Sequence, residues 1–75
     1  MTGSSMTRLA VDSTTLAWVA YDEGSRRLDI QFRDGVRYAY LAVPGHLFRA
    51  LLAAHSKGQF FNRSIRRAFS YVKLS

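Results

Sequence analysis

The sequence contains no cysteine and only one proline in 75 residues. The absence of cysteine excludes a disulfide framework, a thiolate nucleophile and any metal site built on cysteine. No apolar run approaches the roughly 18 residues of a membrane-spanning helix. The N-terminal stretch MTGSSMTR also lacks the apolar segment of a secretory signal peptide. We therefore expect a cytoplasmic protein without a membrane segment, stabilised by packing alone.

Acidic residues are missing from the second part of the chain. Residues 1–43 hold five arginines and five acids, whereas residues 44–75 hold six cations and no acid, so the net charge of +6 lies entirely there. Arginine outnumbers lysine nine to two, and its planar guanidinium is suited to two-pronged contacts with phosphate. This distribution favours a polyanionic partner.

The overall composition predicts a folded chain. It is 48% hydrophobic, 13% aromatic and 21% charged, unlike the apolar-poor composition of disordered segments. Residues 1–8 are rich in Ser, Thr and Gly and have no apolar pattern, so we expect a disordered leader there. Residues 9–75 are expected to form a single domain.

Three strands are predicted before the proline. Residues 16–21 are aromatic and β-branched, and residues 27–33 alternate apolar with polar side chains. Asp34 and Gly35 are expected to form a two-residue turn, after which residues 36–43 return as a third strand. The pattern indicates a three-stranded antiparallel meander.

Two helices are predicted after the meander. Pro44 suits the start of a helix over 44–56, and Gly58 suits its left-handed C-terminal cap. Asn62 is expected to cap a second helix, and residues 71–74 either continue that helix or form a short fourth strand. The solvent face of the second helix carries Arg63, Arg66 and Arg67. The predicted fold class is α+β, three strands followed by two helices.

The predicted turn also assigns side chains to the faces of the sheet. A two-residue turn pairs Gln31 with Tyr38 and Asp29 with Tyr40. Both tyrosines then lie opposite the apolar face, beside Trp18, where aromatic rings can stack nucleobases for about 1–3 kcal/mol per base. In the competing interpretation, the aromatic residues of the C-terminal segment fold over this face and the tyrosines are packing residues.

Catalytic and metal chemistry find little support. The two histidines, His46 and His55, are nine residues apart and fall on opposite sides of a helix. Asp22, Glu23 and Asp34 lie in predicted turns, where acidic residues serve the backbone. Glycine-rich phosphate loops are absent from the sequence. We expect no enzymatic activity, no metal and no cofactor.

Several motifs follow one another in a distinctive order. The chain reads VDSTTLAWVAYD, RLDIQFRDG, Tyr38-Ala39-Tyr40, Val43-Pro44 and SKGQFFN, and then Ile65-Arg66. In this order they resemble the KTSC domain, a small domain found at the C-terminus of some lysyl-tRNA synthetases and as stand-alone bacterial proteins. The resemblance covers roughly residues 6–71. It implies no catalytic residues, and RNA binding is the role usually suggested for the family.

Charge, aromatic content and resemblance together predict a small basic module that binds RNA or another polyanion. We assign phosphate contacts to Arg33, Arg49, Lys57, Arg63, Arg66 and Arg67. We assign stacking or packing beside the nucleic acid to Trp18, Tyr38 and Tyr40. The alternative is a non-enzymatic protein-interaction or homodimerisation module that uses the aromatic sheet face, because aromatic residues and arginine are also enriched at protein interfaces.

Overall fold

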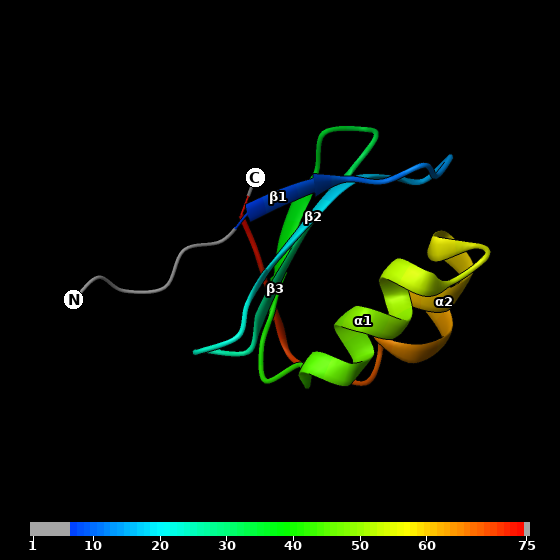
Figure 1. Cartoon of the computed structure of the whole chain (residues 1–75). Coiled ribbons are helices and arrows are strands. Elements are labelled where there is room, and N and C mark those ends of the chain that lie inside the picture. Colours follow the sequence, from blue (N-terminus) through cyan, green and yellow to red (C-terminus); the bar gives the residue numbers. More distant parts are fainter. Residues whose placement is uncertain (1–6, 75) are drawn as a thin grey trace.

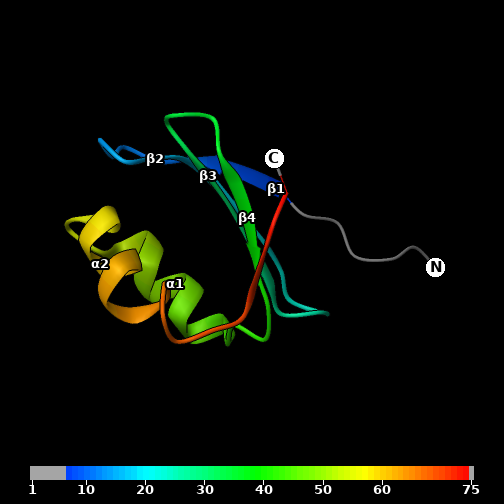
Figure 2. The same cartoon turned by 180° about the vertical axis from the view of Figure 1, so that it is seen from behind.

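The sheet of this protein is covered on one face by two helices (Figures 1 and 2). A computed structural model describes residues 7–74. The elements are β1 (Thr7–Ala10), β2 (Leu16–Asp22), β3 (Arg27–Phe32), β4 (Arg37–Tyr40), α1 (Gly45–Ala53), α2 (Lys57–Ser64) and β5 (Tyr71–Lys73). Neighbouring strands pair antiparallel in the order β1-β2-β3-β4-β5. The predicted α+β class is therefore correct.

The structure has more strands than the sequence predicted. The three predicted strands correspond to β2, β3 and β4, and β1 and β5 extend the sheet at its two edges. The prediction of a leader over residues 1–8 is wrong at Thr7 and Arg8, which belong to β1. Residues 1–6 of that leader lie outside the described part of the chain. The choice left open for residues 71–74 is decided for a strand.

The predicted pairing of the tyrosines is wrong by one residue. Tyr38 lies opposite Ile30 and Tyr40 opposite Leu28. The turn is longer than predicted, because the Phe32 amide donates to the Val36 carbonyl and three residues form the loop. Within that loop Gly35 adopts a φ of +95°, as in three-residue hairpins with a left-handed glycine. The shift turns both tyrosine side chains toward the helices.

The two helices differ from their predicted positions. Pro44 precedes α1 as its N-cap, and Gly58 lies in the first turn of α2 instead of capping α1. The Ser56 hydroxyl accepts a hydrogen bond from the Gln59 amide and so caps α2. Asn62 therefore lies inside α2. Because α2 begins earlier than predicted, it also ends earlier, at Ser64. Arg66 and Arg67, which were predicted on its solvent face, therefore follow the helix.

The core lies between the sheet and the helices. The sheet contributes Val19, Leu28 and Ile30, all fully buried, and the helical layer contributes Leu51 and Phe61. After α2 the chain turns back and runs as β5 beside β4 (Figure 2). The Leu41 amide donates to the Ser70 carbonyl at the start of this pairing. In the described part of the chain, no helix is both long and apolar enough to cross a membrane.

Candidate functional site

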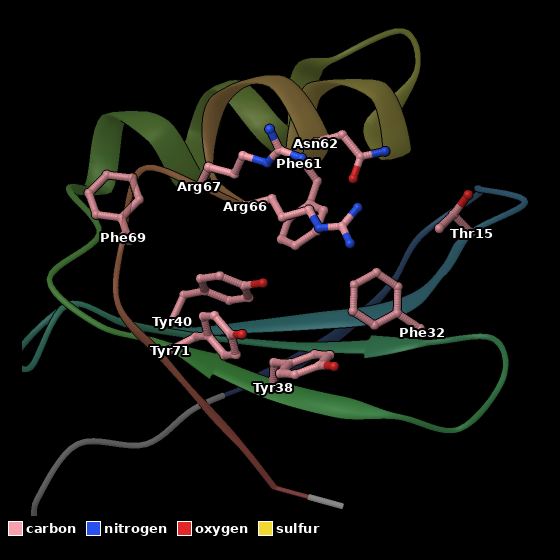
Figure 3. A pocket seen from close by; sticks show the side chains of 10 residues that line it. All are labelled: Thr15, Phe32, Tyr38, Tyr40, Phe61, Asn62, Arg66, Arg67, Phe69 and Tyr71. Atoms are coloured by element: carbon pink, nitrogen blue, oxygen red, sulfur yellow. The ribbon is translucent and has the colours of Figure 1, made fainter.

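An aromatic pocket of about 620 Å³ opens between the sheet and the end of α2 (Figure 3). Its floor is formed by side chains of three neighbouring strands: Phe32 of β3, Tyr38 and Tyr40 of β4, and Tyr71 of β5. Because side chains alternate between the faces of a strand, the one-residue shift in the loop that contains Gly35 determines that Tyr38 and Tyr40 face the pocket. We call this site the aromatic pocket.

The roof of the aromatic pocket comes from α2 and the residues that follow it. Phe61 and Asn62 lie on the last turn of α2, and the chain then turns so that Arg66 and Arg67 flank the opening. The Arg66 amide donates to the Phe61 carbonyl at 2.9 Å, which fixes the backbone at this turn. Figure 3 shows Arg66 reaching over the pocket between Phe61 and Phe32.

The rings of the aromatic pocket meet at their edges. Tyr40 contacts Phe61 at 5.3 Å between centroids with an angle of 82° between the ring planes. Tyr38 contacts Tyr71 at 5.3 Å and 84°, and Phe32 contacts Phe61 at 5.4 Å and 70°. Edge-to-face contacts are favourable for the quadrupoles of aromatic rings. These three contacts fix the rings that form the pocket walls, and none of them is a parallel stack.

The tyrosine hydroxyls of the pocket have no hydrogen-bond partner within residues 7–74, namely those of Tyr38, Tyr40 and Tyr71. By contrast, the hydroxyl of Tyr21, whose ring stacks on Phe48 of α1, donates to the Val43 carbonyl. Burial raises the pKa of Tyr40, as do the neighbouring phenols Tyr38 and Tyr71, while Arg66 opposes the rise. Neutral, unpartnered hydroxyls in a pocket are available to a ligand.

The charge at the rim of the aromatic pocket is uncompensated. Arg66 and Arg67 are both exposed, and neither forms an ion pair with an acid in the described chain. Lys73 pairs with Tyr38 across the β4–β5 ladder, so its side chain emerges on the pocket side of the sheet. An anionic group at the opening would therefore meet positive charge from two directions.

The structure brings four of the nine predicted site residues to the aromatic pocket: Tyr38, Tyr40, Arg66 and Arg67. Arg63 lies apart from them, at a separate hollow beside Phe60 and His55.

Three other predicted cations have partners within the protein. The Arg33 guanidinium donates to the Ser13 carbonyl at 2.7 Å, and the Lys57 ammonium donates to the Ala54 carbonyl at 3.1 Å. Arg49 lies 3.8 Å from the Glu23 carboxylate. None of these three cations lines the aromatic pocket.

Trp18 lies on the opposite face of the sheet from the two tyrosines. Trp18 pairs with Gln31, whereas Tyr38 pairs with the preceding residue, Ile30. Because neighbouring residues of a strand point to opposite faces, Trp18 and Tyr38 lie on different faces of the sheet. The Arg8 guanidinium lies 4.4 Å from the ring centroid of Trp18, and that of Arg37 lies 5.6 Å away. The expectation that Trp18, Tyr38 and Tyr40 share one face is therefore wrong, for the same reason as the register.

Sequence reasoning did not assign the remaining pocket residues to the site: Thr15, Phe32, Phe61, Asn62, Phe69 and Tyr71. Of the C-terminal aromatic residues in the competing interpretation, Phe61, Phe69 and Tyr71 line the pocket with Tyr38 and Tyr40. They do so on the apolar face of the sheet, to which the register shift turns the two tyrosines, and not on the face of Trp18 as expected. In the sequence, Tyr71 and Lys73 alternate with the apolar Val72. This pattern indicates a strand that has Tyr71 and Lys73 on the same face.

Metal ligation receives no support from the described residues, because they contain no group of three His, Asp or Glu side chains near enough to hold an ion.

The motifs that line the pocket belong to a known family. The family model of the KTSC domain matches residues 12–69, which include most of the aromatic pocket. This chain belongs to the KTSC domain family. The crystal structure of a KTSC domain protein from Yersinia pestis has a TM-score of 0.90 to this chain at 38% identity, covering 95% of this chain and 100% of that one.

Other relatives of this KTSC domain differ greatly in length. A protein of Stutzerimonas stutzeri is 40% identical over 58 residues, which are 77% of this chain and 82% of that protein. The lysine–tRNA ligase of Nostoc punctiforme is 33% identical over 67 residues, 89% of this chain and only 12% of the ligase. The resemblance to the ligase is therefore confined to one small part of it.

Proposed function

We propose that this KTSC domain is a small nucleic-acid-binding module whose ligand is RNA. The observation that carries the proposal is the placement of Arg66 and Arg67, exposed and without acidic partners in the described chain, at the opening of an aromatic pocket. Single-stranded nucleic acids bind where cations hold the phosphates and aromatic rings contact the bases. The proposed activity is binding without catalysis or cofactor, in the cytoplasm.

Two further cations are available outside the lining of the pocket. Arg63 is exposed on the last turn of α2, at its own hollow, and Lys73 emerges from β5 on the pocket side of the sheet. Arg33, Arg49 and Lys57 already have partners within the protein, so they contribute less in this proposal. The phosphate contacts are therefore assigned first to Arg66 and Arg67, then to Arg63 and Lys73.

Two further observations favour RNA over other polyanions. Sequences related to this chain form part of lysine–tRNA ligases, whose name gives tRNA as the substrate. The pocket carries three tyrosine hydroxyls, which can exchange hydrogen bonds with bases and with the 2′-hydroxyl that distinguishes RNA from DNA. Sulfated or acidic polymers offer no flat rings for such a pocket.

The test is fluorescence anisotropy of labelled single-stranded RNA, duplex RNA and tRNA at low and near-physiological salt. The Arg66→Gln/Arg67→Gln variant is compared with Arg8→Gln/Arg26→Gln, which removes the same charge from residues that do not line the aromatic pocket and have no assigned phosphate contact. Each lost phosphate contact on a single strand lowers the slope of log K against log salt by about 0.7. We expect the pocket variant to lose about 1.4 from this slope, and the control to change little.

The proposal fails if no RNA binds at tens of micromolar protein even at low salt. It also fails if both double variants weaken binding equally, because binding would then follow net charge and not the pocket. Circular dichroism of both variants establishes that each remains folded.

A second candidate function is protein binding or homodimerisation, favoured by the exposed apolar residues of and beside β5. Tyr71 is 55% exposed, Val72 50% and Leu74 40%, and β5 is an edge strand with one unpaired side. Such edges can pair with another chain. Light scattering at increasing protein concentration tests this candidate, which predicts a dimer that Val72→Lys dissociates.

A further inference from the structure

The size and walls of the aromatic pocket suit a flat ligand. Its volume of about 620 Å³ lies within the roughly 300–1,000 Å³ of small-molecule sites, which are mostly apolar with a few placed polar groups. Its inner wall is the edge-to-face contact of Tyr40 with Phe61, and the rings of Tyr38 and Tyr71 lie in front of that wall on the sheet side (Figure 3). A ligand that packs against these rings must present a flat face.

Tyr71 leaves part of its ring free for such a ligand. Its contact with Tyr38 is edge to face at 84°, and its contact with Tyr40 is tilted at 36°. More than half of Tyr71 is exposed. Exposed aromatic surface at the mouth of a pocket is the type of surface on which nucleobases stack.

The polar groups of the pocket define the edges of the ligand. The three tyrosine hydroxyls point in the same general direction, toward Phe32 and Thr15 (Figure 3). They lack partners in the described chain, and a hydroxyl both donates and accepts. The ligand should therefore carry donors and acceptors on its rim, as a nucleobase does on its Watson–Crick edge.

The cations add a requirement for negative charge beside the flat ring. Arg66 extends over the pocket and Arg67 lies at its upper rim (Figure 3), so an anion attached to the bound ring would lie at the opening. We propose that the aromatic pocket binds one unstacked nucleobase of a single-stranded RNA, with Arg66 and Arg67 on the adjoining phosphates. A base paired within a duplex cannot enter, since it is stacked on both sides.

This inference rests on the proposed RNA binding and specifies the strandedness of the ligand. A free nucleotide has the same chemistry as one nucleotide of a strand, so the test must separate these two sources. Four probes do this: a labelled uridine-rich hexamer, the same strand with all six nucleotides abasic, the duplex of the hexamer, and uridine monophosphate.

The protein variants use the alternation of β5. Tyr71→Ala removes a pocket ring, whereas Val72→Ala truncates the neighbouring residue, which emerges on the other face and is exposed to a similar extent. Tyr71→Phe keeps the ring and removes only the hydroxyl. If Tyr71→Ala fails to fold, the abasic strand on the natural protein and Tyr71→Phe still test the proposal.

We expect the fully abasic strand to bind roughly 5- to 150-fold more weakly than the hexamer, and Tyr71→Ala to weaken hexamer binding by a similar factor, as loss of one stacked base predicts. Val72→Ala should bind like the natural protein, and the duplex should bind much more weakly than the hexamer.

Equal binding of the abasic strand and the hexamer, or of duplex and hexamer, overturns the inference and leaves the proposed RNA binding intact. Binding of uridine monophosphate as tight as the hexamer also overturns it, since the site would then serve a free nucleotide. No binding by any probe contradicts both proposals.

Discussion

The ring of Tyr40 meets the ring of Phe61 edge to face, with 5.3 Å between their centroids. Tyr40 is 3% exposed and Phe61 2%, so this contact joins β4 to α2 at the inner wall of the aromatic pocket. The same two residues therefore support both the core and the candidate site. Changes to them should affect stability and ligand binding in different proportions.

Phe61→Ala is expected to destabilise the protein by about 3–5 kcal/mol, because it leaves a cavity among the rings of Phe32 and Tyr40. Chemical denaturation of the variant measures this loss. Phe69→Ala is the comparison, since Phe69 is only partly buried against the core, and it should cost less. Equal losses for the two variants would contradict the role given to Phe61.

Tyr40→Phe should change the free energy of unfolding little, because the hydroxyl that it removes has no partner within the described residues. Tyr21→Phe is the matched variant, in which the hydrogen bond to the Val43 carbonyl is lost. That loss should cost roughly 1 kcal/mol. Thermal or urea unfolding of both variants decides the matter, and a larger loss for Tyr40→Phe would show that its hydroxyl is satisfied inside the protein.

Two of the four tyrosines should ionise late in an alkaline titration. Burial raises the pKa of Tyr40, reinforced by Tyr38 and Tyr71, and burial raises the pKa of Tyr21. The folded state therefore holds these two phenol protons more tightly than the unfolded state does. The free energy of unfolding is unaffected by them below the ordinary tyrosine pKa of 10.0, and it falls as the pH rises from there through the raised pKa values of the folded protein.

Tyrosinate absorbance measures this, and Tyr40→Phe and Tyr21→Phe should each remove absorbance that the natural protein gains only above the ordinary tyrosine pKa. Absorbance lost at the ordinary tyrosine pKa in either variant would contradict this assignment.

The hairpin of β3 and β4 marks the limit of what the sequence could predict. The alternation of residues 27–33 correctly indicated a strand, and Asp34-Gly35 correctly indicated a turn. A loop of two or of three residues fits the same dipeptide, and one extra residue exchanges the faces of the whole following strand. Local sequence therefore could not decide on which face Tyr38 and Tyr40 lie.

The positions of the helices were limited by competing caps. Ser56 and Asn62 are both favourable N-cap residues, and only packing of Phe61 against the sheet selects the earlier one. The basic character of residues 44–75 was evident from the sequence. Which of its cations remain without partners was not, because the contact of Arg49 with Glu23 joins residues distant in the chain.

Gly35→Ala tests the three-residue loop directly. Gly35 has a φ of +95° and no atom within 4 Å of an added Cβ, so the substitution meets only the conformational cost of the left-handed region, about 1–2 kcal/mol. Gly24→Ala is the control, since its φ lies outside that region and its nearest contact is 3.7 Å away. Unfolding free energies of the two variants should differ by this amount, and no difference would argue against the loop.

The central claim is that RNA binds at the aromatic pocket, and chemical-shift mapping by NMR tests it most directly. A single-stranded hexamer is titrated into the labelled protein, and the ring and guanidinium signals are followed. The account predicts saturable shifts at Tyr38, Tyr71, Arg66 and Arg67, with Trp18 on the opposite face unchanged. Shifts centred on Trp18 and its flanking arginines, with the pocket signals unmoved, would contradict it.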